Sequence, residues 1–172
     1  MILREKKQLF VVLIGGFACV LIAATFLVPW YGIDYFRNGE FDYRSEYSLG
    51  FERASAYVDL SYLMAGLTFV LVLSLIASVN ATILPLLGRT ESGKIASVVS
   101  AELLLASVFI FYAGVIEAGH LDHFSGYTLL NRTVSVETAP MIGWWILVAA
   151  IVSQGAHVTA LVCLNRKKRE GV

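Results

Sequence analysis

Cysteine is scarce in this chain, with only two in 172 residues, and both lie inside long apolar stretches. Cys19 and Cys163 therefore leave the connecting loops without a thiol that could form a disulfide. The scarcity also excludes membrane thiol oxidoreductases of the four-helix type, which need paired reactive cysteines. The sequence contains no glycine-rich phosphate loop, no GxSxG elbow and no HExxH pattern. We therefore predict a chain that is not itself an enzyme and has no cofactor.

Long apolar runs are what the sequence does have. Each run reaches the roughly 20 residues needed to cross a hydrocarbon core about 30 Å thick. Strands of a membrane barrel would show alternation, which these continuous runs lack. We predict an all-α integral membrane protein, a single four-helix transmembrane bundle over residues 1–172 with the lipid bilayer around it. The predicted spans are Leu9–Val28, Val58–Leu87, Ile95–Ile116 and Ile142–Leu164.

Lysine and arginine are distributed unevenly between the predicted loops. Nine of them lie in the amino-terminal stretch, the connector 88–94 and the tail 165–172, whereas loops 29–57 and 117–141 hold four arginines and no lysine. The positive-inside rule places the richer side in the cytoplasm. We expect a multi-pass protein of the cell (plasma) membrane with both termini cytoplasmic. The opposite face is mildly acidic, so nucleic acid is not an expected partner.

The first external loop carries a strong hairpin signal. Asn38-Gly39 separates two stretches in which Tyr and other large residues alternate with polar ones. Both residues tolerate positive φ, which a two-residue turn requires. An isolated hairpin is only marginally stable, and the second loop alternates similarly around Leu130–Thr138. We predict a small extracellular β-sheet built from both loops.

Three positions of the first loop correspond to a known motif, with its glycine and leucine exchanged and phenylalanine in place of its second tryptophan. Trp30 directly follows the first span, and the sequence Ser48-Leu49-Gly50-Phe51 follows about twenty residues later. With four spans and internal termini, this pattern resembles the claudin and peripheral-myelin-protein superfamily through Trp30, Gly50 and Phe51. The family's two cysteines are absent, and Ala54 stands where the first is expected. The resemblance implies a claudin-like external sheet and an adhesion-like or structural role.

Four polar residues lie within the predicted spans. Counting residues from the ends of the spans places them at one depth. A charged group there is costly, so Glu102 is a functional candidate, about 10 Å from the cytoplasmic edge. One interpretation is hydrogen-bonded packing between helices, with Glu102 bonded to His157 or Asn80. The other is an ion or proton site, or the polar end of a lipid or quinone pocket. The predicted layer comprises Asn80, Glu102, Gln154 and His157.

A second polar cluster follows the third span, where Glu117, His120, Asp122 and His123 occur close together. Carboxylate and imidazole groups suit zinc, copper or iron, so a metal site is one hypothesis. The alternative is a solvated cap in which the helix ends at Gly119. In the same loop, Asn131 begins an Asn-Arg-Thr glycosylation sequon.

These features support three functional hypotheses. The first is a non-catalytic structural, adhesion-like or accessory membrane subunit that acts through its external sheet and lateral helix packing. It implies a homo-oligomer or other membrane subunits as partners. The second is a small transporter or ion pathway that uses Glu102 and His157. The third is a membrane subunit of a metal or redox enzyme complex that uses Glu117, His120 and His123.

Overall fold

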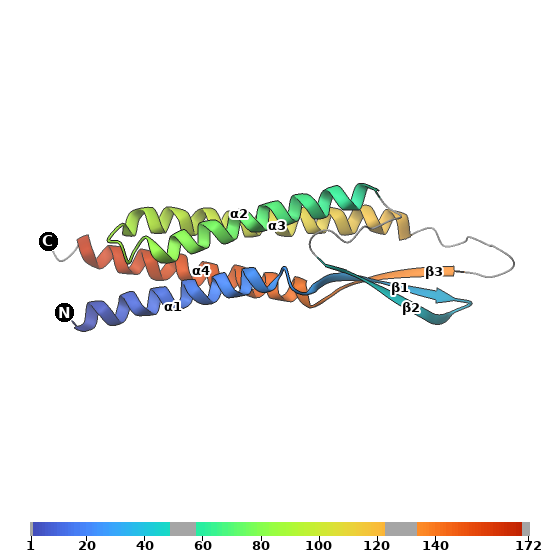
Figure 1. The fold of residues 1–172 in the computed structure, drawn as a ribbon, viewed down its shortest axis with the longest axis horizontal. Helices are drawn as coiled ribbons and strands as arrows, with labels where there is room; N and C mark the ends of the chain where they lie inside the picture. The colour runs from blue at the N-terminus through green and yellow to red at the C-terminus, as the bar shows by residue number, and fades with distance from the viewer. Residues whose placement is uncertain (1, 49–57, 123–133, 170–172) are drawn as a thin grey trace.

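The computed structural model describes residues 2–48, 58–122 and 134–169, which form four helices and three strands. Helices α2 and α3 form one layer of a long bundle, and α1 and α4 form the other (Figure 1). α1 begins and α4 ends at the same end of the bundle, and the sheet projects from the opposite end. The elements are α1 (Ile2–Ala24), β1 (Pro29–Arg37), β2 (Glu40–Ser48), α2 (Val58–Ile83), α3 (Thr90–Asp122), β3 (Val134–Pro140) and α4 (Ile142–Arg169).

Three of the helices are long and apolar enough to cross a membrane. The qualifying segments are Ala65–Ile83, Thr90–Ala113 and Ile142–Leu164, and a shorter apolar helical segment covers Gln8–Ala24. Large apolar side chains point outward along all four helices; for example, Phe17 is 60% exposed and Phe109 is 73% exposed. Such a surface is typical of a helical bundle that lipid surrounds, so the membrane character predicted from the sequence agrees with the fold.

The helix ends differ from the ends of the apolar runs. α1 ends at Ala24 instead of Val28, because the chain must become extended before Pro29, which starts β1. α2 ends at Ile83, and the turn that follows closes at Gly88 with a φ of 76°. α3 is longer than its apolar run at both ends and passes Gly119, so the predicted helix end at that glycine is wrong.

The sheet has the strand order β2-β1-β3, with both pairings antiparallel. Asn38 and Gly39 have φ values of 56° and 84° and join β1 to β2, with Arg37 paired to Glu40. β3 pairs with the other edge of β1, from Tyr31 opposite Pro140 to Arg37 opposite Val134. The predictions of a hairpin at Asn38-Gly39 and of a strand from the later loop are therefore confirmed.

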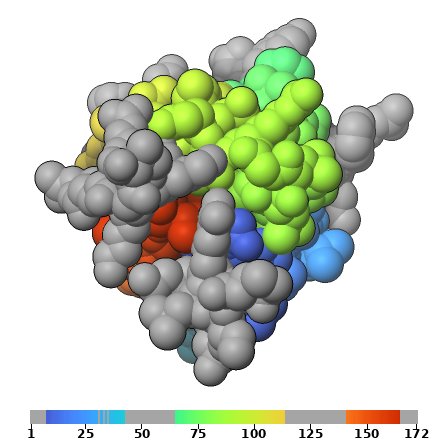
Figure 2. All heavy atoms as spheres, turned by 90° about the vertical axis from the view of Figure 1, so that its left-hand side faces the viewer, coloured from blue at the N-terminus to red at the C-terminus, as the bar shows by residue number. Residues whose placement is uncertain are grey.

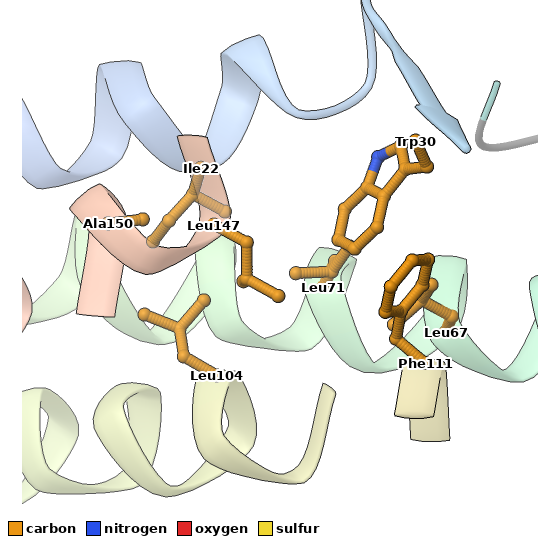
Figure 3. Packing of buried hydrophobic residues seen from close by; sticks show 8 residues of the cluster. All are labelled: Ile22, Trp30, Leu67, Leu71, Leu104, Phe111, Leu147 and Ala150. Carbon is orange, nitrogen blue, oxygen red and sulfur yellow. The ribbon is translucent and has the colours of Figure 1, made fainter. Parts of the chain in front are cut away.

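Trp30 joins the sheet to the bundle. Its indole is fully buried and lies among Leu67, Leu71 and Phe111 (Figure 3). The indole Nε1–H donates to the carbonyl oxygen of Thr25 at 2.7 Å, which satisfies a carbonyl just past the end of α1. The Trp30 carbonyl in turn accepts from the Met141 amide at 2.9 Å, at the start of α4. Strand β1 is thus held to all four helices at one residue.

Candidate functional site: a buried polar network

The interior of the bundle has an apolar half and a polar half. Buried positions follow spacings of three and four residues along each helix, as in helices that pack side by side. Near the sheet these positions hold Ile22, Leu67, Leu104 and Leu147. Toward the end that carries the termini, most of them become small or polar. The buried polar residues there include Ser74, Ser78, Ser97, Ser100, Gln154 and His157.

Gln154 connects three helices. Its Oε1 accepts from the Ser78 hydroxyl of α2 at 3.0 Å, and its Nε2 donates to the Ser97 hydroxyl of α3 at 3.0 Å and the Ser97 carbonyl at 3.2 Å. The side chain is fully buried, so these partners replace the water that an amide would otherwise bind. Cys19 of α1 extends the chain, with its thiol donating to Ser78 Oγ at 3.3 Å.

Ser74 and Ser100 form a second, reciprocal contact between α2 and α3. Each hydroxyl donates to the carbonyl oxygen of the other serine, at 3.1 Å and 3.0 Å. Because backbone oxygens take part, the two helices must approach closely at this point. Gly93 of α3 allows a similarly close approach nearer the turn between α2 and α3, because a Cβ at this position would lie 2.8 Å from the Pro85 ring. Figure 2 shows the α2–α3 turn in yellow-green beside α1 in blue at this end of the bundle.

His157 is fully buried where α1, α3 and α4 meet. Its Nδ1 lies 3.3 Å from the hydroxyl of Ser97, and its Nε2 has no hydrogen-bond partner among the described residues. The ring lies against Gly15, where an added Cβ would be 2.7 Å from Cε1 and 2.8 Å from Nε2. The hydroxyl of Thr82 would contact the same Cβ. Only a glycine at position 15 leaves room for both side chains.

The structure separates the four residues of the predicted polar layer. Gln154 and His157 are in the interior, whereas Asn80 and Glu102 are exposed on the outside. The Asn80 side chain donates to the Ile76 carbonyl of its own helix at 3.0 Å. The proposed bonds from Glu102 to His157 or Asn80 are therefore not formed. The hydrophobic runs could not predict which face of each helix points inward, because apolar residues occur on every face of the helix.

The depth assignment also changes. Ser74 faces Ser100 across the antiparallel helices, so Glu102 lies level with Val72 of α2 and not with Asn80. The estimate from sequence started at Ile95, where the apolar run begins, but α3 itself begins at Thr90. Residue counts from the ends of apolar runs therefore misplaced the two side chains along the bundle.

The side chains of the predicted metal cluster lie outside the described part of the chain. The backbone places Glu117, His120 and Asp122 in the last turns of α3, and His123 lies outside the described residues. Within the side chains that are described, no group of three or more His, Cys, Asp or Glu could hold a metal ion. Gly50, Phe51 and the sequon residue Asn131 also lie outside the described residues.

The serines and the cysteine of the network were missed from the sequence. The signal for the serines was their spacing: Ser74 and Ser78 are four apart, and Ser97 and Ser100 are three apart. These steps keep a residue on one face of a helix. A hydroxyl repeated at that spacing within an apolar run indicates an interior contact between helices. Chemically, the network holds helices together through neutral hydrogen bonds.

Replacing Gln154 by leucine should destabilise the bundle. The change removes three hydrogen bonds and leaves Ser78 and Ser97 buried with fewer partners. Each lost contact between helices in lipid costs about 0.6–2 kcal/mol. Thermal unfolding in one fixed detergent should show a clear drop in midpoint. Thr159→Val is the matched control, because that exposed hydroxyl bonds only to Gly155 of its own helix. Equal midpoints for the two variants would contradict a stabilising role for the network.

A scan against protein-family models and a search of curated proteins found no match to the chain.

Proposed function

We propose that this chain is a plasma-membrane protein with four spans, both termini in the cytoplasm and the sheet outside. Support comes from the three long apolar helices and from the shorter apolar segment that lies beside them in the bundle. The start of α1, the end of α4, and the α2–α3 turn with the beginning of α3 lie together at one end, and nine of the thirteen basic residues belong to these segments. That agreement between charge and fold favours a cytoplasmic position for this end.

Within that arrangement, the chain acts as a non-catalytic structural, adhesion-like or accessory subunit. The observation that carries this proposal is the Trp30 junction, which fixes a projecting sheet to the bundle through Thr25 and Met141. A sheet held this way is a platform for contact with another protein. Its outer strands in the described part of the chain, β2 and β3, each have one edge on which no further strand is paired.

A claudin-like relationship is the finer form of the proposal. The features in its favour are a four-helix bundle, a sheet built from both connecting segments, and a tryptophan at the point where α1 leads into β1. In this view Trp30 is a structural residue that anchors the sheet. The motif positions Gly50 and Phe51 would complete the first loop.

The transport hypothesis receives less support. It required Glu102 and His157 to share one pathway, but His157 meets the interior side of α3 at Ser97 while Glu102 lies on the exposed side of that helix. A subunit role does not depend on their contact.

Site-directed labelling tests the topology. In a Cys163→Ser background, Glu40→Cys next to the hairpin turn should react with a membrane-impermeant maleimide on intact cells. Arg89→Cys, in the connection between α2 and α3, should react only after the membrane is permeabilised. Both positions are exposed, so accessibility within the protein does not limit either reaction. Labelling of both positions from the same side would refute the proposed arrangement.

A further inference from the structure

Glu102 is the one acidic group at its depth on the described outer surface of the bundle. Ser97 of α3 bonds to Gln154 and His157, so Glu102, further along α3, lies level with the region of α4 near Val152. On α2 the corresponding residue is Val72. The outward side chains around this level are otherwise apolar. Among them are Val20, Val72, Leu73 and Val152, which are 64%, 41%, 38% and 69% exposed.

A carboxylate in this position needs a partner once the bundle is in lipid. The hydrocarbon offers no hydrogen-bond donor, and intramembrane acids normally face a protein interior or a water-filled space. Glu102 does neither in the single chain, where it is exposed and has no bonded partner among the described residues. Its position therefore indicates that this face of α3, although exposed in a single chain, is covered when chains assemble.

The residues around Glu102 form a continuous seam on α3. Outward positions recur at steps of three and four, which is the spacing by which two helices interlock. The seam includes the large side chains of Leu105 and Phe109, which are 49% and 73% exposed. We define the α3 seam as Ile95, Val99, Glu102, Leu105, Phe109 and Tyr112.

We propose that a second copy of this chain docks on the α3 seam, with the two α3 helices side by side and the two Glu102 carboxyl groups hydrogen-bonded to each other. A two-fold axis along the membrane normal brings identical residues together at identical depth. A carboxyl group that carries a proton donates through its hydroxyl and accepts through its carbonyl oxygen, so the pair is self-complementary. The inference rests on the proposed membrane topology and names the partner that Proposed function leaves open.

Other faces of a second copy fit Glu102 less well. The exposed polar side chains of α2 and α4, Asn80 and Thr159, each bond to a carbonyl of their own helix. Asn80 also lies about 12 Å nearer the end that carries the termini, given 1.5 Å per residue. At the depth of Glu102, α4 offers Val152 and α2 offers Val72. Contact between the two α3 helices is thus the arrangement that supplies a donor and an acceptor at the required depth.

The first test measures the mass of the purified protein in detergent and the strength of its self-association by energy transfer between labelled copies in vesicles. The wild-type chain should be a dimer. Glu102→Leu should weaken dimerisation about 3- to 30-fold, the range expected for hydrogen bonds between helices in lipid. Glu102→Gln should retain most of it, because an amide also donates and accepts. Val152→Leu, at the same depth on α4, should leave it unchanged.

The second test locates the interface. In a Cys163→Ser background, Val99→Cys and Phe109→Cys should cross-link between copies, whereas Leu73→Cys and Val152→Cys should not. A monomeric wild type, full dimerisation of Glu102→Leu, cross-links through Val152→Cys, or a different protein held on the seam would each overturn the proposal. The Glu40 and Arg89 labelling pattern, measured on the cells that express the protein, separates this failure from a failure of the membrane topology.

Discussion

Trp30→Ala is expected to destabilise the protein more than any other single change considered for this fold. The indole is fully buried, and its ring centroid is 5.4 Å from that of Phe111, which itself stacks on Trp144 at 4.9 Å. Truncating a buried aromatic residue to alanine typically costs about 3–5 kcal/mol, because the cavity does not fully collapse. The change also frees the Thr25 carbonyl from its donor. The thermal unfolding midpoint in a fixed detergent should fall strongly.

Two further variants make the Trp30 test specific. Trp145→Ala is the matched control, since that side chain is 63% exposed and should tolerate truncation. Trp30→Phe keeps a ring in the pocket but removes the Nε1–H donor, so it should fall between the wild type and Trp30→Ala. Trp30 is the second residue of β1, which begins at Pro29, so loss of the indole should loosen the sheet. Protease cleavage within the sheet should therefore be faster in Trp30→Ala than in the wild type. A Trp30→Ala protein as stable as Trp145→Ala would show that the junction does not hold the sheet.

Local chemistry was enough to predict the sheet. Asn38 and Gly39 adopt positive φ as residues of these types readily do, and that turn sets the pairing of Arg37 with Glu40. The later strand was predicted from alternation and lies at Val134–Pro140, a few residues beyond the predicted Leu130–Thr138. Hydrophobic length similarly located all four helices, because lipid-compatible segments need about the same number of apolar residues.

Orientation around each helix could not be predicted in the same way. In a water-soluble bundle, polar residues mark the outside, but here apolar residues occupy both the interior and the surface. Glu102 therefore gave no indication of its direction, and it points away from His157. The register between helices depended on contacts such as Ser74 with Ser100, which no single segment specifies. Serine spacing is the feature that would have oriented α2 and α3.

Gly15→Ala is expected to destabilise the bundle through overpacking. The added methyl would lie 2.7 Å from Cε1 and 2.8 Å from Nε2 of His157 and would also contact the Thr82 hydroxyl. Both neighbours are tied to other groups: the imidazole to Ser97 and Thr82 Oγ1 to the Ser78 carbonyl. Inserting a methyl into such a site typically costs about 1–3 kcal/mol. Unfolding in detergent should report this loss.

The neighbouring glycine provides an internal control for the same substitution. Nothing lies within 4 Å of a Cβ at Gly16, so Gly16→Ala should unfold near the wild-type temperature. If Gly15→Ala and Gly16→Ala unfold together, the close contact between α1 and α4 is not present in the folded protein.

A double substitution measures how much of the overpacking comes from His157, as distinct from Thr82. Removing the imidazole in His157→Ala should itself destabilise, since it leaves a cavity in the interior. In that background, however, the methyl group of Gly15→Ala no longer meets Cε1 and Nε2, and only its contact with the Thr82 hydroxyl remains, so its additional cost should be smaller than in the wild type. Residues in direct contact typically show coupling of about 0.5–3 kcal/mol in such a cycle. Additive effects would mean that Gly15 and His157 do not touch, and α4 would then have to be rotated relative to α1.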